Sequence, residues 1–169
     1  MDNKIGFTLI ELIVVIGVTA LILGISLSYY NNFTAQQQLR AEARKIVDVL
    51  ELAKNKAAAG DSPGTCNGGF EGYRINFTAP NSYSINACCG GTCSSIATYT
   101  IQSNVSVTIQ SSGCIKFRQL AAGLDTSATG CLPFTPTLKS TAFNSPNCLQ
   151  ITIDNSGKVS LNDQTFTSC

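Results

Sequence analysis

The sequence contains no histidine, and charged residues make up only 12% of it. Without an imidazole, neither a Ser–His nor a Cys–His pair can activate a nucleophile. A zinc site would need four thiolates, since no histidine can serve as a ligand. The few carboxylates beyond residue 60 are scattered and form no acid–base motif. We therefore expect no catalytic residues, no metal and no cofactor, and the sequence argues against an enzyme.

Charge is sparse in the C-terminal part of the chain. From residue 60 onward, ten of 110 residues are charged, five basic and five acidic, and the net charge of the whole chain is +1. No global charge directs such a protein toward nucleic acid. Its surface must consist largely of Ser, Thr, Asn, Gln and Gly, which suits a secreted protein that packs against copies or relatives of itself.

Cysteine is absent from the first 65 residues. An even number of cysteines, confined to the part that a membrane segment would export, favours disulfides over a metal site. The sequence does not determine how they pair. The eight cysteines are Cys66, Cys88, Cys89, Cys93, Cys114, Cys131, Cys148 and Cys169.

One long apolar run extends from Phe7 to Leu27 and contains a single charge, Glu11. As a helix it would be about 30 Å long, close to the thickness of the hydrocarbon core of a bilayer. A charge at the centre of a membrane helix costs about 2.5–3.5 kcal/mol, and less near an end. A helix that only anchors a protein in the membrane does not need the charge of Glu11. A helix that leaves the lipid and pairs with a cation does need this charge.

The segment Lys4–Leu12, KIGFTLIEL, resembles the N-terminus of type IV pilins and type II secretion pseudopilins. The resemblance covers about the first 30 residues. It implies that a prepilin peptidase cleaves after Gly6 and that the new N-terminal residue, Phe7, is methylated. It also implies that Glu11 pairs with the N-terminal amine of a neighbouring subunit, because a buried charge is tolerable when it has a partner.

Two other interpretations of the apolar run fit it less well. A secretory signal has a shorter apolar core of about 7–15 residues, and residues 23–26 are a weak cleavage signal. An ordinary signal anchor would lack Glu11 and carry more positive charge than Lys4 before the run.

The pattern predicts an α+β fold in which a long N-terminal helix packs on an antiparallel β-sheet or a β-sandwich head braced by disulfides. Half of this helix would be transmembrane and half amphipathic. We divide the chain into a leader (1–6), a transmembrane or filament-core half of the helix (7–32), an amphipathic half (33–59) and a β-rich head (60–169).

The amphipathic half shows apolar residues at steps of three and four, which is one face of a helix. Ala57-Ala58-Ala59-Gly60, followed by Pro63, predicts where the helix ends. Many type IV pilins have a proline within the helix, but the first proline here is Pro63. The sequence therefore does not predict whether the helix bends. The face consists of Leu39, Ala43, Ile46, Leu50, Ala53 and Ala57.

Beyond residue 60, alternating residues rich in Val, Ile, Thr and Tyr predict strands. A hairpin is expected to turn at 154–157, and residues 119–147 are expected to be a long exposed loop. The order of helix and strands is similar to that of H-type minor pseudopilins, which implies a β-sandwich-like head. The expected strands are 73–77, 83–86, 96–101, 105–109, 114–117, 149–153 and 159–161.

The resemblance implies a structural subunit, a minor pilin or pseudopilin, of a type IV pilus or a type II secretion-like filament. Its partners would be prepilin peptidase, other pilin or pseudopilin subunits in a helical filament, the inner-membrane assembly platform, and membrane lipid before assembly. It would span the inner membrane once and then enter a periplasmic pseudopilus or a cell-surface pilus.

Two alternative functions remain. One is a DNA-binding minor pilin in DNA uptake, in which Lys116 and Arg118, two residues apart on one strand, would contact phosphates. Nucleic acid is not the expected partner, because two cations form only a small basic patch. The other is a plain membrane-anchored extracytoplasmic binding domain. Oxygens at residues 154–156 also fit calcium, but a hairpin turn explains them better.

Overall fold

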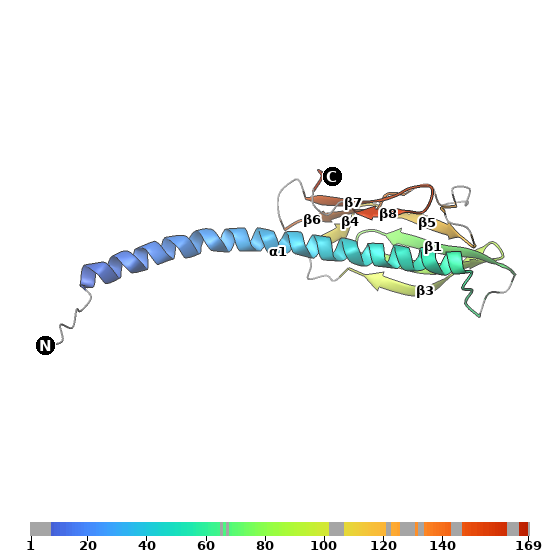
Figure 1. The fold of residues 1–169 in the computed structure, drawn as a ribbon, viewed down its shortest axis with the longest axis horizontal. Helices are drawn as coiled ribbons and strands as arrows, with labels where there is room; N and C mark the ends of the chain where they lie inside the picture. Colours follow the sequence, from blue (N-terminus) through green and yellow to red (C-terminus); the bar gives the residue numbers. More distant parts are fainter. Residues whose placement is uncertain are drawn as a thin grey trace. The chain divides into compact units, whose positions relative to one another are not determined.

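The structure, a computed structural model, contains one long helix, α1 (Leu9–Ala59), and eight strands among the residues that it describes (Figure 1). The chain divides after Thr34 into two compact units, residues 1–34 and 35–169. The described residues are 8–64, 66, 68–101, 107–120, 123–125, 131, 134–142, 147–161 and 166–168, without the side chains of 25–29 and 107.

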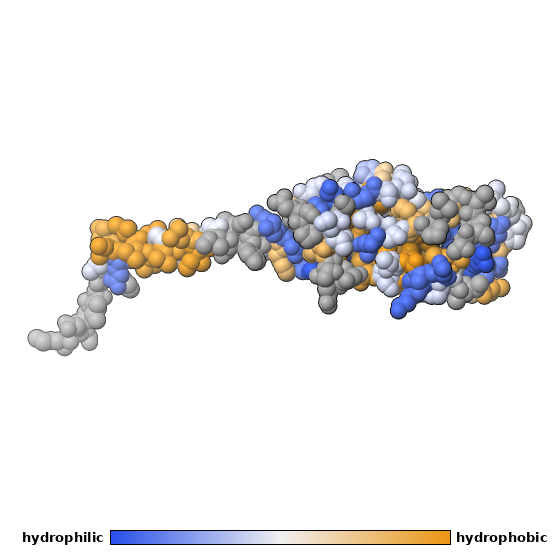
Figure 2. All heavy atoms as spheres, turned by 90° about the horizontal axis from the view of Figure 1, so that it is seen from above, coloured by the Kyte–Doolittle hydropathy of each residue, from blue (hydrophilic) through white to orange (hydrophobic). Residues whose placement is uncertain are grey.

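In the first unit, α1 exposes apolar side chains on every side. All the large aliphatic side chains from Leu9 to Leu23 are more than half exposed, and Figure 2 shows the apolar surface on one side of this part of the helix. Within the described part of the chain, no helical stretch combines the length and hydropathy of a membrane span.

In the second unit, α1 packs one face onto the sheets of the head. The six residues of the predicted apolar face are at most 1% exposed, which confirms that prediction. The helix ends as predicted, at Ala59. Gly60 adopts a left-handed conformation (φ 67°), its N–H donates to the carbonyl of Ala57, and the N–H of Asp61 donates to the carbonyl of Lys56, both at 3.0 Å. These two bonds form a Schellman motif, which satisfies carbonyls at the end of the helix.

The first sheet is antiparallel, in the order β3-β2-β1-β5. Alternate residues of β1 point into the core, so that Tyr73, Ile75 and Phe77 are at most 2% exposed. A β-bulge at the start of β1 places Gly72 against β5, where an added Cβ would lie 2.0 Å from the carbonyl oxygen of Phe117. Only glycine fits there. The strands are β1 (Phe70–Thr78), β2 (Ser82–Cys89), β3 (Thr92–Thr100) and β5 (Gly113–Arg118).

The second sheet is also antiparallel, in the order β4-β6-β7-β8. The predicted hairpin joins β7 to β8, with Ile151 opposite Leu161 and Ile153 opposite Val159. A link between the sheets comes from Leu124, whose N–H donates to the carbonyl of Asn155 in this hairpin turn (3.2 Å). The strands are β4 (Val107–Ile109), β6 (Thr137–Ser140), β7 (Cys148–Ile153) and β8 (Val159–Leu161).

The prediction of a single exposed loop over residues 119–147 is wrong for β6. Leu138 is fully buried and pairs with Leu149 of β7. The four residues of β6 contain one apolar side chain, so their sequence carries almost no periodicity. Their place in the sheet comes from pairing with β4 and β7. The fold class is otherwise as predicted: α+β, with α1 packed on two antiparallel four-stranded sheets and three disulfides among the described cysteines.

Candidate functional site

The first candidate site is the start of α1, where Thr8 and Glu11 cap the helix. The N–H of Glu11 donates to Thr8 Oγ1 (3.4 Å), and the Thr8 hydroxyl donates to Glu11 Oε2 (3.5 Å). This is the Thr-x-x-Glu pattern of a capping box. The carboxylate also lies at the positive end of the helix dipole. Glu11 therefore has a local role in starting the helix, which the sequence analysis did not consider.

The Glu11 carboxylate is exposed, and none of the ion pairs among the described residues involves it. Its neighbours along the helix are exposed and apolar, Ile10 at 71% and Leu12 at 57%. This arrangement can offer a negative charge to a cation on another molecule while the apolar side chains pack around it. The predicted processing residues, Gly6 and Phe7, lie outside the described residues.

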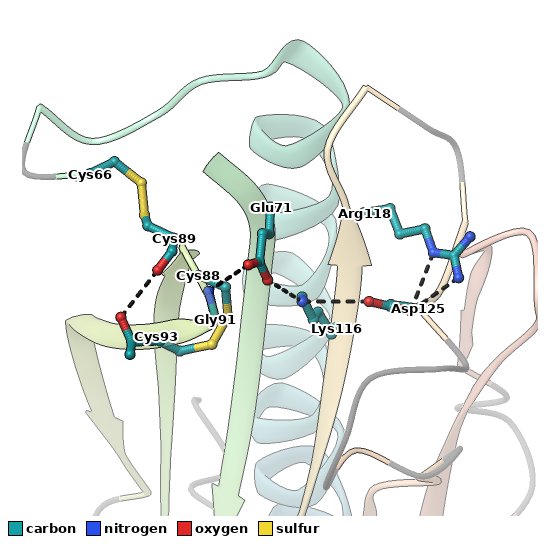
Figure 3. Close-up of polar contacts among 10 residues, drawn as sticks. Cys66, Glu71, Cys88, Cys89, Gly91, Cys93, Lys116, Arg118 and Asp125 are labelled. Atoms are coloured by element: carbon teal, nitrogen blue, oxygen red, sulfur yellow. Dashed lines mark hydrogen bonds and ion pairs between the residues drawn. A yellow bond between two sulfur atoms is a disulfide. The ribbon is translucent and has the colours of Figure 1, made fainter. Parts of the chain in front are cut away.

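The second candidate site is at the end of the head that holds two disulfides (Figure 3). Cys88 and Cys93 cross-link β2 and β3 beside the turn that joins them. Cys66 and Cys89 tie the segment after α1 to the same hairpin. Disulfides typically contribute about 2–4 kcal/mol to stability. The two bonds therefore stabilise this end of the head.

Two further cysteine sites complete the pattern in the head. Cys114 on β5 is bonded to Cys131, inside the predicted loop. Cys148 on β7 is also disulfide-bonded, and Cys169 lies outside the described residues. No described cysteine is free.

Beside the disulfides, an ion-pair cluster joins β1 to β5 (Figure 3). Lys116 Nζ lies 2.8 Å from Glu71 Oε2 and 3.5 Å from Asp125 Oδ2. Arg118 donates to Asp125 Oδ1 from Nε (3.3 Å) and Nη2 (3.1 Å). Because the Lys116 side chain is only 12% exposed and that of Asp125 only 14%, this pair is screened less than a surface pair.

Glu71 also connects the cluster to the disulfide-bonded hairpin. Its Oε1 accepts a hydrogen bond of 2.6 Å from the N–H of Gly91, in the β2–β3 turn. The hydrogen bond from Lys116, followed by that from Gly91, lowers the pKa of the Glu71 carboxyl below its usual value. The carboxylate form of Glu71 thus helps to hold β1, β5 and the hairpin together.

This geometry bears on the predicted DNA contacts. Lys116 and Arg118 lie on one face of β5, as predicted, but each is held by a carboxylate. Arg74 lies opposite Lys116 on β1, so a third cation is close by. The carboxylates of Glu71 and Asp125 offset most of the positive charge of these three cations. Little positive charge is left to bind DNA phosphates, so the arrangement does not support the DNA hypothesis.

The sequence analysis missed Glu71 and Asp125. Glu71 is 45 residues from Lys116 in the sequence, and only the antiparallel register of β1 and β5 brings them together. No local motif signals such a pair, because the contact depends on the pairing of distant strands.

The turn at Asp154 is a hairpin turn, as predicted. Asp154 Oδ1 accepts hydrogen bonds from the N–H of Ser156 and the N–H of Lys158, both at 2.9 Å. The hydrogen bond from the Ser156 hydroxyl, followed by that from the N–H of Lys158, lowers the pKa of this carboxyl below its usual value. Across the described residues, no group of three or more Cys, Asp or Glu side chains is arranged to hold a metal ion.

The N-terminal residues also match a known family motif. Residues 1–27 fit the prokaryotic N-terminal methylation motif. In this segment the chain is similar to type IV pilin-like and pseudopilin-like proteins. Comparison with curated proteins and with solved structures gives no match. Pilin-like proteins are generally not enzymes. The motif covers only the N-terminal segment, so it does not identify the specific role of the chain.

Proposed function

We propose that this pilin-like protein is a structural subunit, a minor pilin or pseudopilin, of a type IV pilus or a type II secretion-like filament. The observation that carries the proposal is Glu11, an exposed carboxylate without an ion pair among the described residues, at the start of a helix that is otherwise apolar. Such a helix needs both an apolar environment and an external cation.

Assembly would cover the apolar side chains that the first unit exposes. Burying one Leu, Ile or Val side chain gives about 1.5–3 kcal/mol, and eleven large aliphatic side chains between Leu9 and Leu23 are more than half exposed. Membrane lipid would cover them first, with the helix inserted in the inner membrane. The packed helices of other subunits would cover them after the assembly platform transfers the chain to the filament.

Processing would supply the cation for Glu11. The motif implies that prepilin peptidase acts on this N-terminus, and we place the cleavage after Gly6. Phe7 then carries a new, methylated amine that can pair with Glu11 of a neighbouring subunit. A buried charge without a partner is strongly destabilising, so this pairing would admit only subunits in the correct register.

The head would form the outer part of the subunit. Its disulfides suit an oxidising compartment outside the cytoplasm. In this proposal, residues 1–6 are the leader, 7–32 the filament-core helix, 33–59 the helix that the head clamps, and 60–169 the head.

The first test is the mass of the N-terminal peptide, together with the abundance of the chain in filaments sheared from cells. We expect a peptide that starts at methylated Phe7 in the membrane fraction, and only traces of the chain in surface filaments if it is a minor subunit. Gly6→Ala should leave the leader uncut. Gly17→Ala is the matched control, because an added Cβ at Gly17 meets nothing within 4 Å. Normal processing of Gly6→Ala would exclude the assigned cleavage site.

A further inference from the structure

Strand β3 forms an open edge of the first sheet. It pairs with β2 on one side, and none of the described residues makes a backbone hydrogen bond to its other side. The opposite edge is different, because the segment around Gly123 covers β5: the N–H of Arg118 donates to the carbonyl of Gly123, and the N–H of Asp125 to the carbonyl of Lys116. Backbone donors and acceptors therefore remain available along β3.

The composition of β3 lacks the usual protection of an edge strand. Edge strands are normally guarded by charged side chains, proline or short length. β3 is nine residues long, TCSSIATYT, without a charge or a proline. It can therefore pair with a further strand, and that strand meets no charge on β3.

An apolar groove lies next to this edge. It has a volume of about 190 Å³ and is bounded by Leu52 near the end of α1 and by Ile96, Ala97 and Tyr99 of β3. Leu52 is 44% exposed and Ile96 is 51% exposed. The groove is thus an accessible apolar surface between the helix and the strand.

A β-bulge directs Ile96 into this groove. Ala97 pairs with Ile85 and Ser95 pairs with Asn86, so Ile96 has no partner on β2. A bulge re-aims the side chain of its extra residue. Ile96 consequently lines the groove together with Ala97, its neighbour in sequence, although adjacent residues in a regular strand face opposite ways.

The charges at the end of the groove are satisfied within the chain. Lys56 Nζ lies 2.7 Å from Asp61 Oδ2, and the hydroxyl of Tyr73 donates to the carbonyl of Asp61 at 2.7 Å. A charged ligand would find no unpaired counter-charge among these groups. The groove therefore favours an uncharged, apolar occupant.

We propose that β3 and this groove bind an extended, uncharged segment of another extracytoplasmic protein. The segment adds a fifth strand to the first sheet. Main-chain hydrogen bonds to β3 supply affinity, and alternate apolar side chains enter the groove beside Leu52 and Ile96, which supplies specificity. An extended peptide is the occupant that matches both a row of backbone groups and an adjacent apolar groove.

A second copy of β3 fits less well. In an antiparallel pair, Ala97 and Tyr99 of the copy would face the groove, but its α1 would run in the opposite direction. Two copies with opposite α1 directions could not both insert their helices into one membrane in the same orientation. This argument rests on the proposed function, in which α1 is inserted in the membrane. In a parallel two-fold pair the direction is kept, but the strand is turned over, so that polar residues such as Thr98 face the groove.

The test uses the full chain in detergent micelles and the uncharged peptide acetyl-Thr-Val-Ser-Val-Thr-Val-Ser-amide as the probe. We expect saturable binding, measured by fluorescence anisotropy of a labelled copy. Ile96→Lys should weaken binding about tenfold or more, because a charge then occupies the groove. Thr98→Lys is the matched control, since it places the same charge on the opposite face of β3, and it should change binding less than about twofold.

Leu52→Gln tests the other wall of the groove and should also weaken binding. Circular dichroism shows whether each variant folds; both residues are about half exposed, so folding should persist. A probe N-methylated at all seven residues should not bind, because no residue of it then has a backbone N–H that can donate to β3. The proposal is overturned if the probe does not bind, if Ile96→Lys binds like Thr98→Lys, or if the N-methylated probe binds equally. It is also overturned if wild type dimerises reversibly and Ile96→Lys is monomeric, since a second copy is then the occupant. None of these readouts depends on filament assembly.

Discussion

Lys116 on β5 donates to Glu71 on β1 across 2.8 Å, and this ammonium is also 3.5 Å from Asp125. One side chain thus joins β1, β5 and the segment that follows β5. Glu71 extends the connection to the β2–β3 turn through Gly91. The end of the head that carries two disulfides is therefore held by electrostatic contacts as well as by covalent bonds.

Replacing Lys116 with methionine should lower the free energy of unfolding by about 1–2 kcal/mol, since the change keeps the apolar stem but leaves Glu71 and Asp125 without this cation. Thermal unfolding of the full chain in detergent micelles measures the effect. Lys139→Met on β6 is the matched control, because Lys139 makes no ion pair within the described part of the head. Equal stability of the two variants would show that the cluster does not stabilise the head.

Glu71 should make stability depend on pH. Its folded-state pKa is lowered by Lys116 and Gly91, so its contribution is present above the ordinary value of 4.5 and is lost as the pH falls through the folded-state pKa. The Glu71 side chain is 37% exposed, so solvent reduces the effect. We expect the stability difference between wild type and Glu71→Gln to shrink below about pH 4.5. The same comparison in a Lys116→Met background should show a weaker dependence; an unchanged dependence would remove Lys116 as the main cause.

A fourth disulfide should join Cys148 to Cys169. Cys148 is disulfide-bonded, and six other cysteines are paired with one another. Cys169 is the one cysteine that remains, so we expect it to be the partner of Cys148. Thr167, two residues before Cys169 in the sequence, exchanges two backbone hydrogen bonds with Cys148, of 2.8 and 3.0 Å. These bonds bring Thr167 close to Cys148. Mass spectrometry of the non-reduced, alkylated protein should find a Cys148–Cys169 peptide. A Cys169 that reacts with the alkylating agent would contradict the assignment.

Much of the fold follows from local patterns. The stripe from Leu39 to Ala57 predicts the buried face of α1, and Gly60 predicts its end, because both depend on residues within a few turns of helix. The strands with alternating Val, Ile and Tyr were also predictable. β6 was not, because Leu138 alone carries its apolar signal and pairing with distant strands decides its place.

The candidate sites divide in the same way. The N-terminal motif is local, so Gly6, Phe7 and Glu11 could be proposed from sequence, although Thr8 as the capping partner of Glu11 was missed. The cation pair at Lys116 and Arg118 was noticed, but its carboxylates come from distant segments. The groove beside β3 depends on a bulge at Ile96, which exists only through the register of β3 with β2.

Two roles of Glu11, as a capping residue and as a charge for assembly, can be separated by three substitutions. Glu11→Gln keeps a side chain suited to the capping box but removes the charge. Thr8→Ala keeps the charge but removes the cap, at a cost of about 1 kcal/mol to the helix. Glu11→Leu removes both. All three leave the apolar run intact, so membrane insertion and leader cleavage should continue.

If the charge directs assembly, Glu11→Gln and Glu11→Leu should both enter filaments about tenfold less than wild type, whereas Thr8→Ala should be incorporated nearly normally. The reason is that loss of one member of a buried ion pair leaves the other, the N-terminal amine of a neighbour, uncompensated. Quantitative mass spectrometry of purified filaments, relative to the processed chain in the membrane, measures incorporation. If Glu11→Gln assembles like wild type while Thr8→Ala and Glu11→Leu fail together, Glu11 serves to start the helix, and the charge-pairing part of the proposed function must be abandoned.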